Sequence, residues 1–334
     1  MRSRLSGIKR CVENILTYSS LGFSRALDSA GLVELVVSTD YNMRGVVKHL
    51  HQAAREKLGG SLCLMAAEKL ARSSKPLLAT GFRIRRFNAA LETDGPVSAT
   101  LLATCLEKVL GVESVIATDM GFERVLQKGL QAADVKHSRV IGLPADSELS
   151  RRVFTNFVEE ESPDLSVAIE RPAANKLNVY HNAVGEDVSS LHAPLDKLLE
   201  WLRWNKVPLV AFGDGGNEVG MGLVMDAVQK HVEYGGVCRC GCGGGIASNT
   251  GCDVLVVSSF SDLGVYGTMA LMQESMLDLA IDKLGDVMKV LVDAGCVDAR
   301  KGLGYLGVDG LSLEGIKSIV HLLRSVSRSD AQLL

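Results

Sequence analysis

The chain has no large excess of either charge. Its 334 residues contain 36 Lys and Arg against 39 Asp and Glu, which gives a formal net charge of −3. A protein that binds nucleic-acid phosphates normally has a basic domain, so this composition argues against a nucleic-acid partner. No run of about 18 apolar residues is present, which argues against a membrane-spanning helix and a membrane partner. With only 7 Pro and no Pro/Ser-rich linker, the sequence shows no division into modules.

Two nucleotide-binding motifs are also missing. The Gly-rich segment 213–222 is not followed by Gly-Lys-Ser/Thr, and no G-x-G-x-x-G motif follows the first predicted strand. A phosphate-binding Walker loop needs the first motif, and a dinucleotide-binding fold normally carries the second. These absences argue against a nucleotide-binding Rossmann enzyme.

Cysteine, in contrast, is present in 8 copies. Cys63 and Cys105 lie in apolar runs with helical spacing, where a free thiol behaves as a small hydrophobic group. We therefore predict an intracellular, reducing environment, in the cytoplasm or the mitochondrial matrix. Residues 1–12 carry Arg and Lys without an acidic residue, a weak resemblance to an organelle transit peptide. An amphipathic first helix with a solvated basic face is the favoured interpretation.

Short apolar runs alternate with amphipathic stretches along the rest of the chain. A stripe of Leu from Leu195 to Leu202 predicts a helix behind Pro194, and Ser312 is a predicted N-cap for a helix over 313–323. Strands that are apolar on both faces and separated by helices predict an α/β fold, with a mainly parallel sheet covered by helices on both faces in a Rossmann-like layered architecture. We expect an N-terminal helical segment over residues 1–30 and a single domain over 31–334. The predicted strands are 76–79, 115–117, 140–143, 165–169, 207–212 and 253–257.

The segment 210–222 has the highest density of residues that could bind a ligand or catalyse a reaction. A buried strand runs directly into two carboxylates, Asp214 and Glu218, with the amide of Asn217 and the backbone of Gly215 and Gly216 between them. Carboxylates suit binding of an ammonium group or a hard cation, or general acid and base roles. Glycine lets the backbone approach a ligand. A helix predicted from about Gly220 would point free N–H groups at an anion. A structural turn with a helix cap is the alternative.

A second candidate site is Glu92-Thr93-Asp94-Gly95-Pro96, where we predict that Thr93 or Asp94 caps a helix that begins near Pro96. After the predicted strand 165–169, Arg171 offers a guanidinium suited to a carboxylate; a surface ion pair is its alternative. Cys238, Cys240 and Cys242 suggest a metal, but zinc sites usually show C-x(2–4)-C pairs, and no second pair or His cluster has suitable spacing. Their alternation better fits a short strand with thiols on one face.

Taken in order, these segments resemble the D-glutamate cyclase family, namely its C-terminal catalytic domain and stand-alone relatives. The resemblance covers most of residues 40–325 and is anchored by the segment 213–222 together with Glu92-Thr-Asp-Gly-Pro96. It implies an α/β fold and a lyase of D-amino acid metabolism that converts D-glutamate to 5-oxo-D-proline and water. Further motifs that carry it are Arg44-Gly45, Thr80-Gly81-Phe82, Thr118-Asp119, Ile169-Glu170-Arg171-Pro172, Tyr180 with Asn182, Ala193-Pro194-Leu195-Asp196, Ser261-Asp262-Leu263-Gly264-Val265-Tyr266 and Val308-Asp309-Gly310-Leu311.

The chain departs from this family pattern where Arg is expected. The stretch after Pro172 reads Ala-Ala-Asn-Lys-Leu-Asn, without the family's second Arg, and Val184 stands where another family Arg would be. Arg is the usual partner of a substrate carboxylate. Two alternatives therefore stay open: a hydrolase or lyase for another small amino-acid derivative, and a non-catalytic metabolite-binding relative.

For the cyclase chemistry we expect Asp214 or Glu218 as the base and Asp94 as the second carboxylate. Asn217 and the loop N–H groups would stabilise the oxyanion, and Arg171 would hold the remaining carboxylate of a small amino-acid substrate. A divalent cation, Mg or Mn, is the one cofactor considered, held by Asp94, Asp214 and Glu218. A homodimer is the one protein partnership considered. The remaining substrate-binding residues expected from the resemblance are Glu92, Thr93, Gly95, Tyr180, Asn182, Gly215, Gly216 and Tyr266.

Overall fold

A computed structural model describes residues 23–327 and contains one central sheet of six parallel strands. All six strands predicted from the sequence are present, with bounds that differ from the prediction by at most two residues. Four of them are buried along their whole length, which is why they read as continuous apolar runs. The strands are β1 (Pro76–Thr80), β4 (Val115–Asp119), β5 (Arg139–Leu143), β6 (Leu165–Ile169), β7 (Leu209–Gly213) and β8 (Val254–Val257).

The order of the strands decides where a ligand can bind. The sheet runs β5-β4-β1-β6-β7-β8, so the chain moves outward from β1 to one edge and then returns to β6 on the other side of β1. Adjacent β1 and β6 are paired in register, with Thr80 opposite Ile169. Such a reversal opens a crevice outside the carboxyl ends of the two central strands. This is the doubly wound order, and it confirms the predicted α/β layered class.

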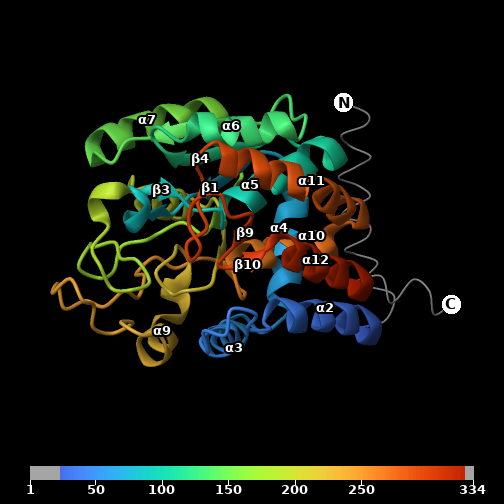
Figure 1. Ribbon diagram of the computed structural model, residues 1–334, viewed down its shortest axis with the longest axis horizontal. Coiled ribbons are helices and arrows are strands. Elements are labelled where there is room, and N and C mark those ends of the chain that lie inside the picture. Colours follow the sequence, from blue (N-terminus) through green and yellow to red (C-terminus); the bar gives the residue numbers. More distant parts are fainter. Residues whose placement is uncertain (1–22, 328–334) are drawn as a thin grey trace.

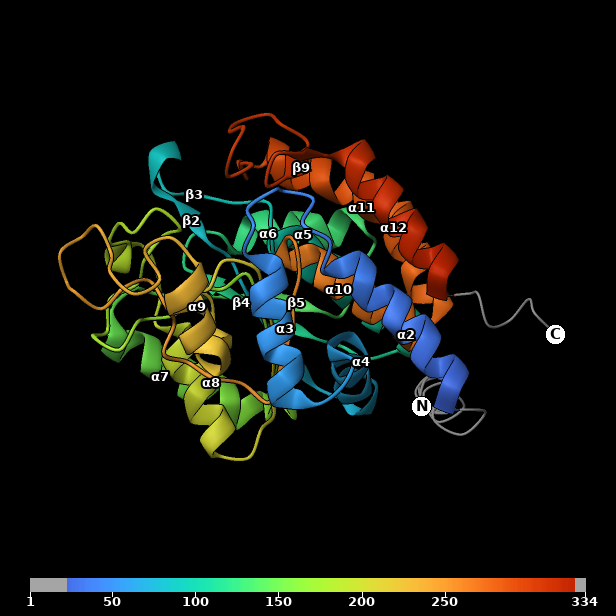
Figure 2. The ribbon, with the colours of Figure 1, turned by 90° about the horizontal axis from the view of Figure 1, so that it is seen from below.

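Helices cover both faces of the sheet, and segments from the two ends of the described chain lie side by side. Figures 1 and 2 show α2 running beside α12, and the two helices are in contact. The helices are α2 (Phe23–Val37), α3 (Val47–Leu58), α4 (Leu62–Arg72), α5 (Pro96–Cys105), α6 (Glu123–Ala132), α7 (Ser147–Glu161), α8 (Leu195–Trp204), α9 (Met225–His231), α10 (Ser261–Met272), α11 (Glu274–Asp293) and α12 (Leu313–Ser327). Two hairpins complete the fold, β2 (Arg83–Ile84) with β3 (Ala90–Leu91) and β9 (Gly307–Val308) with β10 (Leu311–Ser312).

Several local predictions can be compared with these elements. The Leu stripe forms α8, and Ser312 caps α12 by accepting a hydrogen bond from the N–H of Gly315 at 3.2 Å. The helix expected from Gly220 is wrong in its start, because Met221–Val224 forms a 3₁₀ turn and α9 begins only at Met225. Helix α2 runs across residue 30, and the basic residues 1–12 lie outside the described residues. No helix within residues 23–327 is long and apolar enough to cross a membrane.

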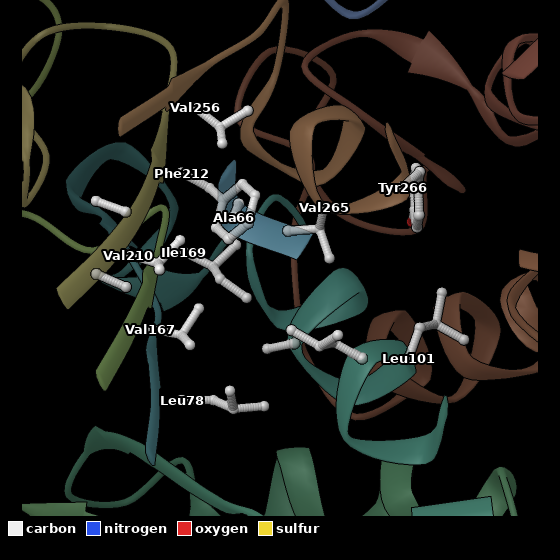
Figure 3. Packing of buried hydrophobic residues seen from close by; sticks show 14 of the residues in the cluster. Ala66, Leu78, Leu101, Val167, Ile169, Val210, Phe212, Val256, Val265 and Tyr266 are labelled. Atoms are coloured by element: carbon white, nitrogen blue, oxygen red, sulfur yellow. The ribbon is translucent and has the colours of Figure 1, made fainter. Parts of the chain in front are cut away.

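Helix α10 packs directly against the sheet at the centre of the core. Figure 3 shows Phe212 of β7 and Val256 of β8 beside Val265, with Tyr266 projecting from a different side of the helix. A Cβ on Gly264 would lie 3.0 Å from a Val256 methyl and 3.1 Å from the Phe212 ring. Glycine at this position therefore permits the close approach of α10 to β7 and β8.

A second close contact of α10, about one turn further along the helix at Gly267, gives a stability prediction. A Cβ on Gly267 would lie 2.6 Å from a methyl of buried Val37, whereas a Cβ on Gly285 of α11 meets nothing closer than 3.6 Å. Gly267→Ala should therefore lower the free energy of unfolding by about 1–2 kcal/mol, since overpacking outweighs the helix propensity that is gained. Gly285→Ala, the matched control, should raise it by about 0.5–1 kcal/mol. Urea denaturation measures both values, and equal effects of the two substitutions would contradict this packing.

Candidate active site

A cleft of about 450 Å³ lies at the carboxyl ends of β1, β6 and β7, at the reversal point of the sheet. A larger hollow of about 710 Å³ lies between α7 and α8, but no carboxylate lines it. We take the smaller cleft as the candidate site because ionisable groups converge there. Its acidic lining is Glu92, Asp94, Glu170, Asp214, Glu186, Glu218 and Asp309, and its basic lining is Arg44, Arg83, Arg85, Arg86 and Arg300.

Asp214 is the centre of this acidic cluster. It belongs to two sets of carboxylates whose oxygens lie within 4.8 Å of one another, one with Asp94 and Asp309 and the other with Glu170 and Glu218. The side chain is 5% exposed. The structure therefore brings together Asp94, Asp214 and Glu218, the three carboxylates predicted to act, around one cleft, and adds Glu170 and Asp309 to them.

Arg44 is the positive charge nearest to the cluster. Its guanidinium forms two contacts with the Asp214 carboxylate, at 2.7 and 3.2 Å, and lies 3.8 Å from Asp309. The same guanidinium donates to the carbonyl of Ser259 at 2.9 Å, which holds it in place. Asp214 and Asp309 raise the pKa of Arg44 despite the opposing effect of burial, so this charge is permanent. In the sequence Arg44 stands out only as part of the Arg44-Gly45 motif, and its role as the counter-ion of Asp214 was not predicted.

One arginine does not neutralise several buried carboxylates. Burial raises the pKa of Asp214 to about 7, and the nearby Glu218 charge adds to this effect against the opposing influence of Arg44. Burial and the Asp214 charge raise the pKa of Asp309 to about 6. Burial also raises the pKa values of Glu92 and Glu170 well above their usual range. The cleft therefore holds protonated and ionised carboxyl groups together near neutral pH, as acid and base catalysis requires.

Glu218 folds the Gly-rich loop around itself. Its two carboxylate oxygens accept hydrogen bonds from the N–H groups of Gly215 and Gly216, each at 2.7 Å. The prediction that these N–H groups are free to stabilise an oxyanion is therefore wrong for this conformation, because an internal carboxylate already occupies them. Asn217 donates instead to the carbonyl of His181 at 2.8 Å, which ties the loop to the segment that follows β6. Both observations favour a positioning role for Glu218.

Asp94 and Asp262 cap two helices reciprocally. Asp94 accepts from the N–H groups of Ser261 and Asp262, both at 2.9 Å, at the start of α10. Asp262 accepts from the N–H of Gly95 at 2.8 Å and of Ser98 at 3.3 Å, at the start of α5. The prediction that Thr93 or Asp94 caps the helix at Pro96 is therefore wrong, because a residue from a distant helix supplies that cap.

Thr93 and Gly95 have structural roles beside these caps. The hydroxyl of Thr93 donates to the carbonyl of Gly307 at 2.7 Å. Gly95 has φ 88°, and a Cβ there would lie 2.6 Å from the Thr80 hydroxyl and 2.8 Å from the Ile169 carbonyl. Only glycine allows α5 to start this close to the ends of β1 and β6. Neither residue lines the cleft.

Glu170 is a second feature that the sequence analysis did not select. It follows β6 directly, with φ 44°, a region that non-glycine residues rarely occupy, and its carboxylate accepts from the hydroxyl of Ser261 at 2.5 Å. Backbone strain of this kind is common at functional sites. Glu92, which was predicted as a substrate-binding residue, is 5% exposed and lines the same cleft.

Arg171 does not hold a substrate carboxylate in this structure. It is fully buried, and its guanidinium forms a fork with Asp119 at 2.7 and 2.9 Å. It also donates to the carbonyls of Gly81 and Ala193 at 3.0 and 2.7 Å. Arg171 and His192 hold the pKa of Asp119 well below its usual range although burial opposes this. The prediction for Arg171 is therefore corrected: its charge is satisfied inside the protein, beneath the cleft.

The two predicted tyrosines also lie away from the cleft. Tyr180 donates to Asp196 at 2.5 Å and lines the hollow between α7 and α8. Tyr266 is 1% exposed and packs in the core behind Asp262, and its hydroxyl has no hydrogen-bond partner within the described part of the chain. Asn182 does line the cleft, with its amide donating to Glu186 at 2.8 Å. The sequence alone could not show which of these three residues lies in the cleft, because burial depends on the packing of distant elements.

Comparison with known proteins supports the resemblance seen in the motifs. Residues 33–324 match the protein family described as D-glutamate cyclase-like, C-terminal. The chain belongs to the D-glutamate cyclase-like family. It is also 29% identical over 247 residues to the human protein named D-glutamate cyclase, mitochondrial, an alignment that covers 70% of this chain. The matched region spans 37% of the length of that human protein. The resemblance drawn from the motifs is thereby confirmed at the level of the family.

The acidic cluster predicts how stability depends on pH. Asp214 and Asp309 have folded-state pKa values raised from 3.8 to about 7 and about 6, so the folded state keeps protons that the unfolded chain loses above about pH 4. The stabilisation is full below pH 4 and is lost as the pH rises through 6 and 7. The melting temperature should therefore decline between about pH 4 and 7, and Asp309→Asn should reduce this decline, by about 1–3 kcal/mol in unfolding free energy. Exposed Asp282→Asn is the control, and an unchanged decline in Asp309→Asn would refute the assignment.

The Arg171 correction can be tested separately. Arg171→Ala should lower the free energy of unfolding by about 3–5 kcal/mol, because it leaves the buried carboxylate of Asp119 without its partner. Arg139→Ala, which breaks an exposed pair with Glu161, should cost less than about 1 kcal/mol. Chemical denaturation measures both. A stable Arg171→Ala protein whose only defect is weak substrate binding would restore the original prediction.

Proposed function

We propose that the chain is an enzyme that cyclises D-glutamate to 5-oxo-D-proline with loss of water. The observation that carries the proposal is the cleft itself, in which buried carboxyl groups with raised pKa values surround a single arginine and arginines line the rim. Membership of the D-glutamate cyclase-like family supports the same reaction. The substrate has the matching chemistry, since it carries one ammonium group and two carboxylates.

Lactam formation requires a neutral amine, and Asp214 is the base in this proposal. The pKa of about 7 lets Asp214 accept a proton from the substrate ammonium group near neutral pH. The ion pair with Arg44 holds the Asp214 carboxyl group in one orientation. The substrate ammonium group is also the cation that a cleft with several carboxylates attracts most strongly.

Glu170 and Glu92 are the acids in this proposal, in place of Asp94. Burial raises their pKa values well above the usual range, which favours the protonated form that an acid needs. The amine nitrogen bonds to the γ-carboxyl carbon, and the carbon–oxygen bond to the leaving oxygen breaks. The two protons lost by the nitrogen balance the two that convert this oxygen to water, passing through Asp214 and the acid. Asp94 is left to position α10, because both its oxygens accept backbone N–H groups.

The rim arginines replace the family arginines that the sequence lacks. Arg300 lines the cleft and donates to the carbonyl of Asn42 at 3.4 Å, and Arg85 donates to the carbonyl of Asp187 at 3.0 Å. Each of these bonds engages one nitrogen of a guanidinium that has five N–H donors. In our proposal these two side chains bind the α-carboxylate that the reaction leaves unchanged.

A divalent cation fits the ligand type of the cleft. Carboxylate oxygens suit Mg or Mn, and the set Asp94, Asp214 and Asp309 has the spacing for one ion. Asp94 belongs to this set and to the set first predicted with Glu218. Both oxygens of Asp94 and both oxygens of Glu218 accept backbone hydrogen bonds, so in either set an ion would share a carboxylate with the backbone. When bound, such an ion would supply Lewis-acid polarisation of a carboxyl oxygen.

The central test is turnover of D-glutamate by the purified protein, followed as 5-oxoproline formed, with and without Mg or Mn. Asp214→Asn should lower kcat by about 10²–10⁴-fold, because it removes the base but keeps the shape of the side chain. Asp226→Asn, an exposed change on α9, is the matched control and should keep the wild-type rate. An active Asp214→Asn protein would refute its role. Absence of turnover, combined with a thermal shift on adding D-glutamate or a lactam, would favour the non-catalytic alternative.

The rim arginines give a separate kinetic prediction. Arg300→Met should raise the KM for D-glutamate by about 10-fold or more with a smaller change in kcat, because a charged hydrogen bond to the substrate is lost. Exposed Arg151→Met, on α7 outside the cleft, is the control. Steady-state kinetics separate KM from kcat. An unchanged KM in both Arg300→Met and Arg85→Met would place the carboxylate site elsewhere.

A further inference from the structure

The fold brings four soft ligands together outside the cleft. Cys238, Cys240 and Cys242 lie on the long loop between α9 and β8, and His181 lies on the loop after β6. Their ligand atoms are all within 4.8 Å of one another. The sequence analysis found no histidine at a suitable spacing because His181 is 57 residues before the first of these cysteines. The predicted short strand is absent, since residues 237–245 form bends and irregular backbone.

The distances within this cluster suit a tetrahedral ion. The sulfur of Cys238 lies 3.4 Å from that of Cys240 and 3.2 Å from that of Cys242. The Nε2 atom of His181 lies 3.2 Å from the Cys240 sulfur and 3.6 Å from the Cys242 sulfur. Ligands about 2.0–2.3 Å from a central zinc are separated by roughly 3.3–3.8 Å along the edges of a tetrahedron. The four separations lie within this range or just below it. The separations are far longer than the roughly 2.05 Å of a disulfide.

Glycines shape the loop around this point. Gly241, Gly243 and Gly245 have φ values of 86°, 79° and 69°, a left-handed conformation that other residues rarely adopt. Gly241 lies between Cys240 and Cys242, and Gly243 and Gly245 follow Cys242, so the backbone bends sharply around the last two thiols. A loop of this length without helix or strand inside a compact domain needs another source of order.

Backbone and side-chain amides point at one of the sulfurs. The N–H of Gly244 lies 3.4 Å from the Cys242 sulfur, and the amide of Asn175 lies 3.5 Å from it. The same Asn175 amide donates to the carbonyl of Gly245 at 2.7 Å. Such N–H groups stabilise a thiolate, which is the form that binds a metal. His181 is 1% exposed and directs its Nε2 atom into the cluster, so its position is built and not a chance surface arrangement.

We propose that Cys238, Cys240, Cys242 and His181 form a structural zinc site. Three thiolates and one imidazole form a soft ligand set that selects zinc over Mg or Mn. Because the protein supplies all four ligands, no position is open for a substrate, which indicates a structural rather than a catalytic ion. On binding, each protonated thiol releases its proton to solvent.

The zinc ion would fix one wall of the cleft. The carbonyl of Gly185 accepts from the N–H groups of Arg239 and Cys240, at 2.9 and 3.0 Å, so the two loops are already paired beside the cluster. Asn182 and Glu186, on the same loop as His181, line the cleft. The carbonyl of His181 accepts from Asn217, so the metal ligand is connected directly to the Gly-rich loop. The ion therefore orders a part of the active site without contacting the reaction.

The test measures the metal content of the full chain purified under reducing conditions. We expect about one zinc per chain in the wild type and at least a five-fold lower content in His181→Ala and Cys240→Ser. Cys63→Ala removes a buried thiol on α4, outside the cluster, and should keep the zinc. Asp214→Asn should also keep it, which separates this site from any ion held by the carboxylates and from the proposed reaction.

Replacement of zinc by Co²⁺ in the wild type tests the ligands without any variant that could misfold. Tetrahedral cobalt with three thiolates gives an intense ligand-field band and sulfur-to-cobalt charge transfer, and we expect both. A wild-type protein that contains no zinc and gives no such spectrum overturns the proposal. A disulfide among the three cysteines in freshly purified, reduced protein, detected by mass spectrometry, overturns it as well. Zinc that stays at the wild-type level in both His181→Ala and Cys240→Ser places the ion elsewhere and also refutes the site.

Discussion

The reciprocal caps between α5 and α10 hold the site together. Asp94 caps α10 and Asp262 caps α5. The start of α5 and the start of α10, which follows β8, are therefore joined at one point. Ser261, at the start of α10, also donates to Glu170 at the end of β6. Each carboxylate satisfies backbone N–H groups that would otherwise be unpaired in the interior. Loss of either cap would release a helix and a cleft residue together.

The same arrangement explains why the carboxyl groups keep unusual protonation states. Removing several acids from water favours their neutral forms, and one arginine offsets only part of that cost. Asp214, which pairs with Arg44, has its pKa raised to about 7, while burial and neighbouring carboxylates raise the pKa values of Glu92 and Glu170 well above their usual range. Pairing with Arg44 therefore gives Asp214 a pKa different from those of the other carboxyl groups in the cleft. This is a general way to obtain a base and an acid from carboxyl groups alone.

The sequence predicted the strands well because a strand buried on both faces leaves a local, continuous apolar signal, as in 165–169 and 254–257. It also located Asp214 and Glu218, because carboxylates beside glycines after a strand are a local pattern. The partners were not predictable. Arg171 and Arg44 both lie in motifs that suggest a functional role. Only the packing shows that Arg171 pairs with Asp119 in the interior and that Arg44 pairs with Asp214 in the cleft. Likewise, nothing near Cys240 in the sequence points to His181.

Arg44 lies before the first strand, between α2 and α3, although its charge acts at the ends of strands that follow it in the chain. The sheet and its crossover helices alone therefore lack a charged residue that the proposed reaction uses. A version of the fold that began at β1 would contain every carboxylate of the cleft but would lack the guanidinium that pairs with Asp214. The helices α2 and α3 therefore belong to the functional unit, because the segment between them supplies Arg44.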